Sequence, residues 1–102
     1  MKITIAQSVW IQNHELCSAS HLIEVSGLSV EEFEELVAVG VVQPVSLSAE
    51  PSSFQMSDLP TVMTASRLRN DFELDLHGLS LAMTLMQRIE SLQTRLRLLT
   101  SE

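Results

Sequence analysis

The stretch that decides the fold reads Leu28-Ser29-Val30-Glu31-Glu32-Phe33-Glu34-Glu35-Leu36-Val37-Ala38-Val39-Gly40-Val41-Val42. Ser29 is followed three residues later by Glu32, which is the spacing of a capping box, and Leu28 and Phe33 have the spacing of a hydrophobic staple. Gly40 is suited to the left-handed conformation that ends many helices, and Val41 beyond it can fold back onto the last turn. The stretch therefore predicts a helix that begins after Ser29 and ends near Gly40.

This predicted helix has one apolar and one acidic side. At about 100° per residue, the apolar side consists of Phe33, Leu36, Val37 and Gly40. The opposite side consists of Glu31, Glu34, Glu35 and Ala38. We therefore expect the apolar side to pack on the domain core and the acidic side to face solvent.

The negative charge of the chain is concentrated in the part that contains this helix. Residues 1–60 carry the whole formal charge of −7, whereas acidic and basic residues cancel after residue 60. Such a distribution repels phosphate and anionic lipid and attracts basic protein surfaces. At 102 residues, the chain is expected to form one domain with a shallow core and no large active-site cavity.

The residues before the opening stretch predict a second, shorter helix. Ser18 or Ser20 can cap it, and Gly27 ends it one residue before the next helix's staple. Two short helices joined by a glycine turn form a helix-turn-helix. Residues 1–17 are expected to form an N-terminal extension, with one or two short strands suggested by the apolar residues at 3–11.

The residues after the opening stretch predict a wing and a third helix, so that residues 18–75 form a winged helix-turn-helix with one added helix. The wing is a hairpin over 45–54, which turns around Pro51. Ser57 is the expected N-cap of the third helix, and Pro60 fits its first turn. Its predicted buried stripe consists of Leu59, Val62, Met63, Ala65, Leu68 and Phe72.

Residues 76–102 predict a long C-terminal helix that begins after the cap Asp75. From Leu76 to Leu99 it would span about 36 Å, more than so small a domain can cover. Its apolar residues alternate in steps of three and four, as in a coiled-coil seam, at Ala82, Leu85, Ile89, Leu92, Leu96 and Leu99. The wide apolar band at 79–89 also fits packing on the helix's own domain. We expect a homodimer whose interface contains Ile89, Leu92, Leu96 and Leu99.

The predicted fold is mainly α, a winged helix-turn-helix with a small β wing and a long C-terminal helix. In this order of elements, and in Ser29, Phe33 and the run Gly40-Val41-Val42, the chain resembles the winged-helix domain of MerR-type regulators. Those regulators carry a DNA-facing Arg and a Tyr where this chain has Glu34 and Glu35. Because Glu repels the phosphate backbone, the sequence predicts a retained scaffold that no longer reads DNA.

A narrower resemblance rests on two longer blocks. The run from Ser26 to Pro44, together with Arg67 to Asp75 and Gly78 to Met86, resembles the bacterial chaperone modulator family CbpM. The resemblance implies a non-enzymatic inhibitor that binds the J-domain of a CbpA-type, Hsp40-like co-chaperone. It also implies that both the co-chaperone activity and the DNA binding of that partner are restrained.

Two functions of different class follow from the sequence. The first is J-domain binding, in which Glu31, Glu32, Glu34 and Glu35 meet the basic helix that J-domains present to Hsp70. An ordinary solvated helix would show the same Glu-rich face. The alternative function is a MerR-like DNA-binding transcriptional regulator, with Arg67 and Arg69 placed to touch phosphates.

Enzymatic and metal-dependent functions are not predicted. Cys17 and His21 have the spacing of a ligand pair, but the further ligands of a zinc site have no recognisable spacing. The sequence has no phosphate-binding glycine loop or nucleophile motif, so no catalytic residue or cofactor is expected. With a single cysteine and no targeting segment, a cytoplasmic location is expected.

Overall fold

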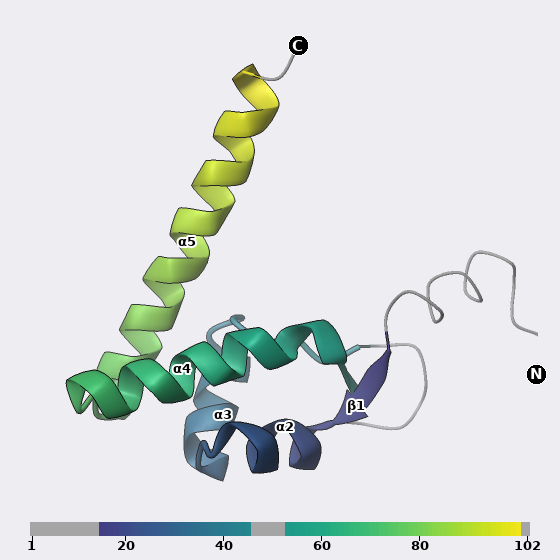
Figure 1. The fold of residues 1–102 in the computed structure, drawn as a ribbon, viewed down its shortest axis with the longest axis vertical. Helices are drawn as coiled ribbons and strands as arrows, with labels where there is room; N and C mark the ends of the chain where they lie inside the picture. The colour runs from purple at the N-terminus through teal and green to yellow at the C-terminus, as the bar shows by residue number, and fades with distance from the viewer. Residues whose placement is uncertain (1–14, 46–52, 101–102) are drawn as a thin grey trace, which may run out of the picture.

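The computed structural model of the protein describes residues 15–45 and 53–100 and is mainly helical (Figure 1). The elements in order are β1 (Leu16–Ser18), α2 (Ala19–Ser26), α3 (Val30–Ala38), β2 (Ser53–Gln55), a 3₁₀ turn η1 (Met56–Asp58), α4 (Leu59–Phe72) and α5 (Leu76–Thr100). This confirms the predicted fold class, with two short helices, a small sheet and a long last helix. The strands predicted within residues 3–11 lie outside the described residues.

Helices α2 and α3 form the predicted helix-turn-helix. Ser18, rather than Ser20, caps α2, because its hydroxyl accepts a hydrogen bond from the backbone N–H of His21 at 3.1 Å. Gly27 ends α2 with a φ of 80°. In α3 the capping box is complete: the Glu32 N–H donates to the Ser29 hydroxyl at 3.0 Å, and the Ser29 N–H donates to the Glu32 carboxylate at 2.9 Å.

The end of α3 folds back as predicted. Gly40 has a φ of 84°, a left-handed conformation that glycine adopts without the cost a side chain would impose. The N–H groups of Val41 and Val42 then both donate to the carbonyl of Leu36, at 2.9 and 3.3 Å. The two valine side chains are buried, so the turn brings this segment back onto the core.

The core lies where α2, α3 and α4 meet the first turns of α5. Phe33 of α3 and Phe54 of β2 make an edge-to-face contact, with ring centroids 5.2 Å apart and an interplanar angle of 77°. The buried apolar residues are Leu22, Leu28, Phe33, Leu36, Val41, Val42, Phe54, Val62, Ala65, Leu79 and Met83. This core positions α3 so that its acidic side faces outward.

The small sheet differs from the predicted hairpin. Strand β2 pairs antiparallel with β1, and Cys17 lies opposite Phe54. The pairing brings the segment before α2 against the segment before α4, and sequence spacing alone does not predict such a contact. Within the predicted hairpin, the described residues retain one link, a hydrogen bond of 2.7 Å from the Val45 N–H to the Ser53 carbonyl. The turn between them, residues 46–52, lies outside the described residues.

Helix α4 begins later than predicted. Ser57 is not its N-cap, because it lies inside the turn η1 and its hydroxyl donates to the Gln55 side chain at 3.0 Å. Asp58 is in the N-cap position without a side-chain hydrogen bond to the helix, and Pro60 lies in the first turn as predicted. The 3₁₀ turn supplies the entry to the helix, since the Leu59 N–H donates to the Met56 carbonyl.

Two residues of the predicted α4 stripe are exposed. Met63 lies about 100° around the helix from the buried Val62 and is 44% exposed. Phe72 lies in the last turn, beyond the part of α4 that packs on the core, and is 68% exposed. The prediction was therefore right for the middle of the stripe and wrong for these two positions.

The effect of Asp58, at the N-cap position of α4, on the stability of the domain is expected to depend on pH. Burial raises the pKa of its carboxyl, so the folded state binds a proton more readily than the unfolded state. The stability contribution of Asp58 therefore falls as pH rises from the ordinary carboxyl pKa through the raised one. We expect Asp58→Asn to increase the free energy of unfolding at pH 7 by less than about 1 kcal/mol, because partial hydration weakens the effect.

Urea denaturation at pH 7 and at pH 3 checks this prediction. The gain from Asp58→Asn should vanish at pH 3, where aspartate is protonated in both states. A variant that is less stable than the unmodified chain at pH 7 would show instead that the Asp58 charge favours α4 through the helix dipole.

Helix α5 begins as predicted and then leaves the domain. The Asp75 carboxylate caps it by accepting from the Gly78 N–H at 2.7 Å. Leu79, Ser80 and Met83 are buried, whereas every residue from Thr84 to Thr100 is exposed. Figure 1 shows the later turns of α5 extending away from the other helices. Leu85 and Ile89, which could belong to an apolar band that packs on the same domain, are 52% and 53% exposed.

Among the described residues, no helix is long and apolar enough to cross a membrane.

Candidate protein-binding surfaces

The outer side of α3 is the first candidate surface. Glu31 and Glu34 are exposed, and Glu35 is partly exposed on the same side. Val30, also exposed, lies at the start of this side and adds an apolar contact area. The described part of α2 and α3, residues 19–38, contains no Lys or Arg. The surface therefore combines negative charge with a small apolar patch, which suits a basic protein surface rather than a polyanion.

Glu32 differs from the other three glutamates because the domain itself occupies its carboxylate. Its side chain is only 14% exposed, and it accepts both from the Ser29 N–H of the capping box and from the Arg69 guanidinium of α4. Arg69 also donates to the carbonyl of Gly27, at 3.4 Å. Arg69 thus joins the end of α4 to the turn between α2 and α3. Within residues 15–45 and 53–100 this is the only ion pair.

Removing the Arg69 link should loosen the placement of α3. We expect Arg69→Met to lower the free energy of unfolding by about 1 kcal/mol, because a partly buried carboxylate loses a charge-assisted hydrogen bond. Urea denaturation at neutral pH measures the change. Arg67→Met, at an exposed position two residues earlier, is the matched control and should change stability little. Equal stability of the two variants would show that Arg69 does not stabilise the domain.

The second candidate surface is the apolar seam of α5. Counting about 100° per residue from the buried Leu79 and Met83 places the seam on the opposite side of the helix. The seam is about half exposed from Leu85 to Leu92, and its exposure is highest near the end of the helix, at 62% for Leu96 and 79% for Leu99. The chain therefore leaves five large apolar seam residues uncovered: Leu85, Ile89, Leu92, Leu96 and Leu99. A contiguous exposed apolar stripe of this kind is typical of interaction surfaces.

The predicted cysteine and histidine pair can be placed in the structure. Cys17 is partly buried in β1, and burial, followed by the nearby Asp58 carboxylate, raises the pKa of its thiol. His21 is exposed in the first turn of α2. In the part of the chain that the structure describes, no three His, Cys, Asp or Glu side chains are grouped to hold a metal ion.

Comparison with known proteins assigns the chain to a family. The sequence model of a family described as MerR HTH family regulatory protein matches residues 13–101. The chain is 38% identical over 74 residues to the Chaperone modulatory protein CbpM of Escherichia coli O1:K1 / APEC, an alignment that covers 72% of this chain and 73% of that protein. The chain belongs to the CbpM family. The CbpM of Escherichia coli O45:K1 (strain S88 / ExPEC) matches with the same identity and coverage.

The match to the MerR family model confirms the broader resemblance found in the sequence, and the CbpM relatives, whose name describes chaperone modulation, confirm the narrower one. In this CbpM-family chain, α3 is the second helix of the helix-turn-helix. In DNA-binding helix-turn-helix proteins, this second helix contacts the bases. Sequence reasoning missed the pairing of Arg69 with Glu32. The two residues are 37 positions apart, so no local spacing could have indicated it.

Proposed function

We propose that this chain binds the J-domain of a CbpA-type co-chaperone and thereby inhibits its co-chaperone and DNA-binding activities. The observation that carries the proposal is the exposed acidic side of α3, at the position of the recognition helix. Family membership supports a chaperone-modulating role, and the charge of α3 supports a basic partner. Complementary charge speeds the encounter of two such surfaces and disfavours competing acidic partners.

The four predicted contact residues are not equally available to a partner. Glu31 and Glu34 are exposed, so both can meet a partner without breaking internal contacts. Glu35 lies partly covered beside them. Glu32 is held by Ser29 and Arg69, so its part is to position α3 rather than to make the main contact. The proposed contact therefore centres on Glu31, Glu34 and Glu35.

Calorimetric titration of the full chain with a purified J-domain tests the proposal. We expect saturable binding that weakens as salt is raised, because exposed charges are screened. In parallel, the chain should reduce the stimulation of Hsp70 ATPase by the full co-chaperone. A heat signal no larger than dilution, with unchanged ATPase stimulation, would overturn the proposal.

A DNA-binding regulator is the second candidate function, because the matching family over residues 13–101 is described as regulatory. A gel shift with random duplex at low salt separates the two functions. A regulator should retard the duplex, since phosphate contacts dominate nonspecific binding. A chain with an acidic α3 should leave the duplex unshifted while it still binds the J-domain.

We also propose that the chain forms a homodimer through the seam of α5. The steps of three and four along the seam read the same in both directions, so two antiparallel copies can match every seam residue. The layers in this register would be Ala82 with Leu99, Leu85 with Leu96, and Ile89 with Leu92, each formed twice. An a position then faces a d position in every layer, which is the pattern of antiparallel coiled coils.

A further inference from the structure

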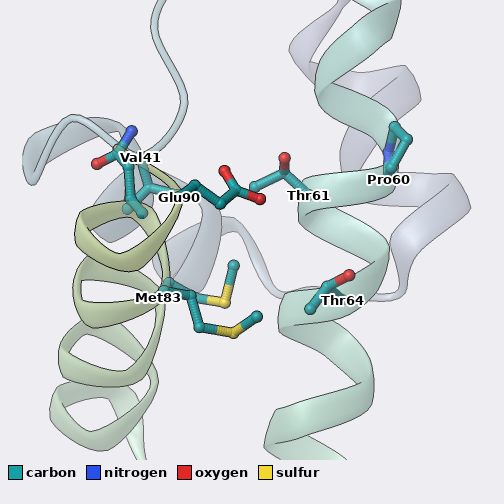
Figure 2. A pocket seen from close by; sticks show the side chains of 8 residues that line it. Val41, Pro60, Thr61, Thr64, Met83 and Glu90 are labelled. Carbon is teal, nitrogen blue, oxygen red and sulfur yellow. The ribbon is translucent and has the colours of Figure 1, made fainter. Parts of the chain in front are cut away.

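A cleft opens where α5 diverges from α4, on the side of α5 that faces the domain (Figure 2). Its volume is about 150 Å³. The apolar part of its wall is formed by Val41, Pro60, Met83 and Met86, and its polar part includes Thr61 and Glu90. The α5 seam lies on the opposite side of the helix, so the proposed dimer would leave this cleft uncovered.

Glu90 is the charged group of this cleft. In Figure 2 its side chain reaches from α5 across the opening toward Thr61 of α4, above Met83. No Lys or Arg is among the residues that line the cleft. Gln87, one turn earlier on α5, donates from its side-chain amide to the Gly40 carbonyl at 3.1 Å and thereby holds the wall of the cleft against the end of α3.

A second hollow adjoins the first and carries another carboxylate. The two hollows share Val41 and Gln87, and the second one extends to Asp58 at the start of α4. Its lining also lacks a basic residue. The combined groove therefore joins the apolar wall of the first hollow to a carboxylate in each hollow, Glu90 in the first and Asp58 in the second. Low-dielectric walls focus such a potential, so the groove favours a cation that also brings apolar surface.

We propose that this groove holds an Arg or Lys side chain of a basic protein partner. The aliphatic stem of that side chain lies against Met86, with the largely buried Met83 at the base of the groove, and its charged head meets the Glu90 carboxylate. Long basic side chains combine these two properties, and methionine adapts its shape to them. A charge-assisted contact in a partly covered groove contributes more than one on an open surface. The identity of the partner as a J-domain rests on the proposed function.

Methyl NMR tests the proposal directly, because the chain has two methionines in the groove and one exposed on α4 as an internal control. The full chain, labelled at its methionine methyl groups, is titrated with the purified J-domain. We expect the Met83 and Met86 signals to shift and the Met63 signal to stay in place. Binding of the J-domain without a shift at Met83 and Met86 would overturn the proposal.

A matched pair of variants adds an energetic test by calorimetry. Glu90→Gln should weaken J-domain binding by about tenfold, because the cationic head loses its carboxylate. Glu24→Gln removes the same charge from the exposed side of α2 and should weaken binding less than about twofold. Equal effects of the two variants would overturn the proposal, since they would reflect net charge alone.

Two further outcomes separate this proposal from others. If no J-domain binds, the proposed function fails, and N-acetyl-argininamide becomes the probe of the groove. It should shift Met83 and Met86 in the unmodified chain but not in Glu90→Gln, and no shift in either would overturn the groove proposal. If the Met83 and Met86 signals shift on raising the concentration of a chain that carries Leu92→Glu and Leu96→Glu, whose seam cannot pair, a second copy occupies the groove and the proposal is wrong.

Discussion

Replacing Glu31, Glu34 and Glu35 together by Lys is expected to weaken J-domain binding by at least about a hundredfold at low salt. Each reversal would replace attraction toward the basic helix of the proposed J-domain partner by repulsion. The helix itself should tolerate the change. Lys at positions 34 and 35 lies in the last turns of α3, where the helix dipole favours positive charge and offsets the less favourable Lys at position 31.

Calorimetry at two salt concentrations measures the effect, and circular dichroism verifies that the variant is folded. The matched control reverses three exposed acidic residues elsewhere, Glu15, Glu24 and Asp71, which changes the net charge by the same amount. The control should keep most of the affinity. Equal losses in the two triple variants would attribute the effect to net charge, and unchanged affinity of the α3 variant would remove this side of α3 from the interface.

The second large effect concerns the seam of α5. Replacing Leu92 and Leu96 by Glu is expected to convert the proposed dimer to a monomer, with a dissociation constant raised by at least about a thousandfold. In an antiparallel dimer the two changes place four carboxylates in the apolar interface. The isolated domain should stay folded, because neither side chain contacts the core and both are exposed in a single chain.

Sedimentation equilibrium of the full chain measures this change. Ser91→Glu with Thr94→Glu adds the same charge to the same part of α5 but off the seam, so this control should remain dimeric. Dimerisation through the seam would be ruled out if the unmodified chain is a monomer at high concentration. It would also be ruled out if the variant that carries both Leu92→Glu and Leu96→Glu is still a dimer. J-domain binding should survive in the monomer, because α3 lies outside the seam.

The caps of α3 and α5 and the glycine ends of α2 and α3 could be predicted because they depend on residues a few positions apart, whereas the predicted N-cap of α4, Ser57, was wrong. The capping box of Ser29 and Glu32, the cap at Asp75 and the left-handed Gly27 and Gly40 are all in the structure as the sequence indicates. In each, the deciding hydrogen bond or backbone conformation joins neighbours in the chain. The acidic outer side of α3 follows from the same local periodicity.

Contacts between distant segments could not be predicted in this way. Strand β1 pairs with β2, and Arg69 reaches Glu32, only because the packed core brings their elements together. The same holds for exposure. Phe72, Leu85 and Ile89 have the spacing of buried residues, yet they are exposed because α4 ends and α5 leaves the domain where the core stops.

The sequence by itself determined the helix-turn-helix, the charge of its second helix and the length of the last one, since periodicity, caps and composition are local properties. The tertiary structure alone decided which glutamate is held by Arg69 and which remain free for a partner. It also decided that the seam of α5 points away from the domain, and that a groove lined by Glu90 opens on the opposite side of the same helix. These features depend on the angle at which packed helices meet, and side-chain packing across the core sets that angle.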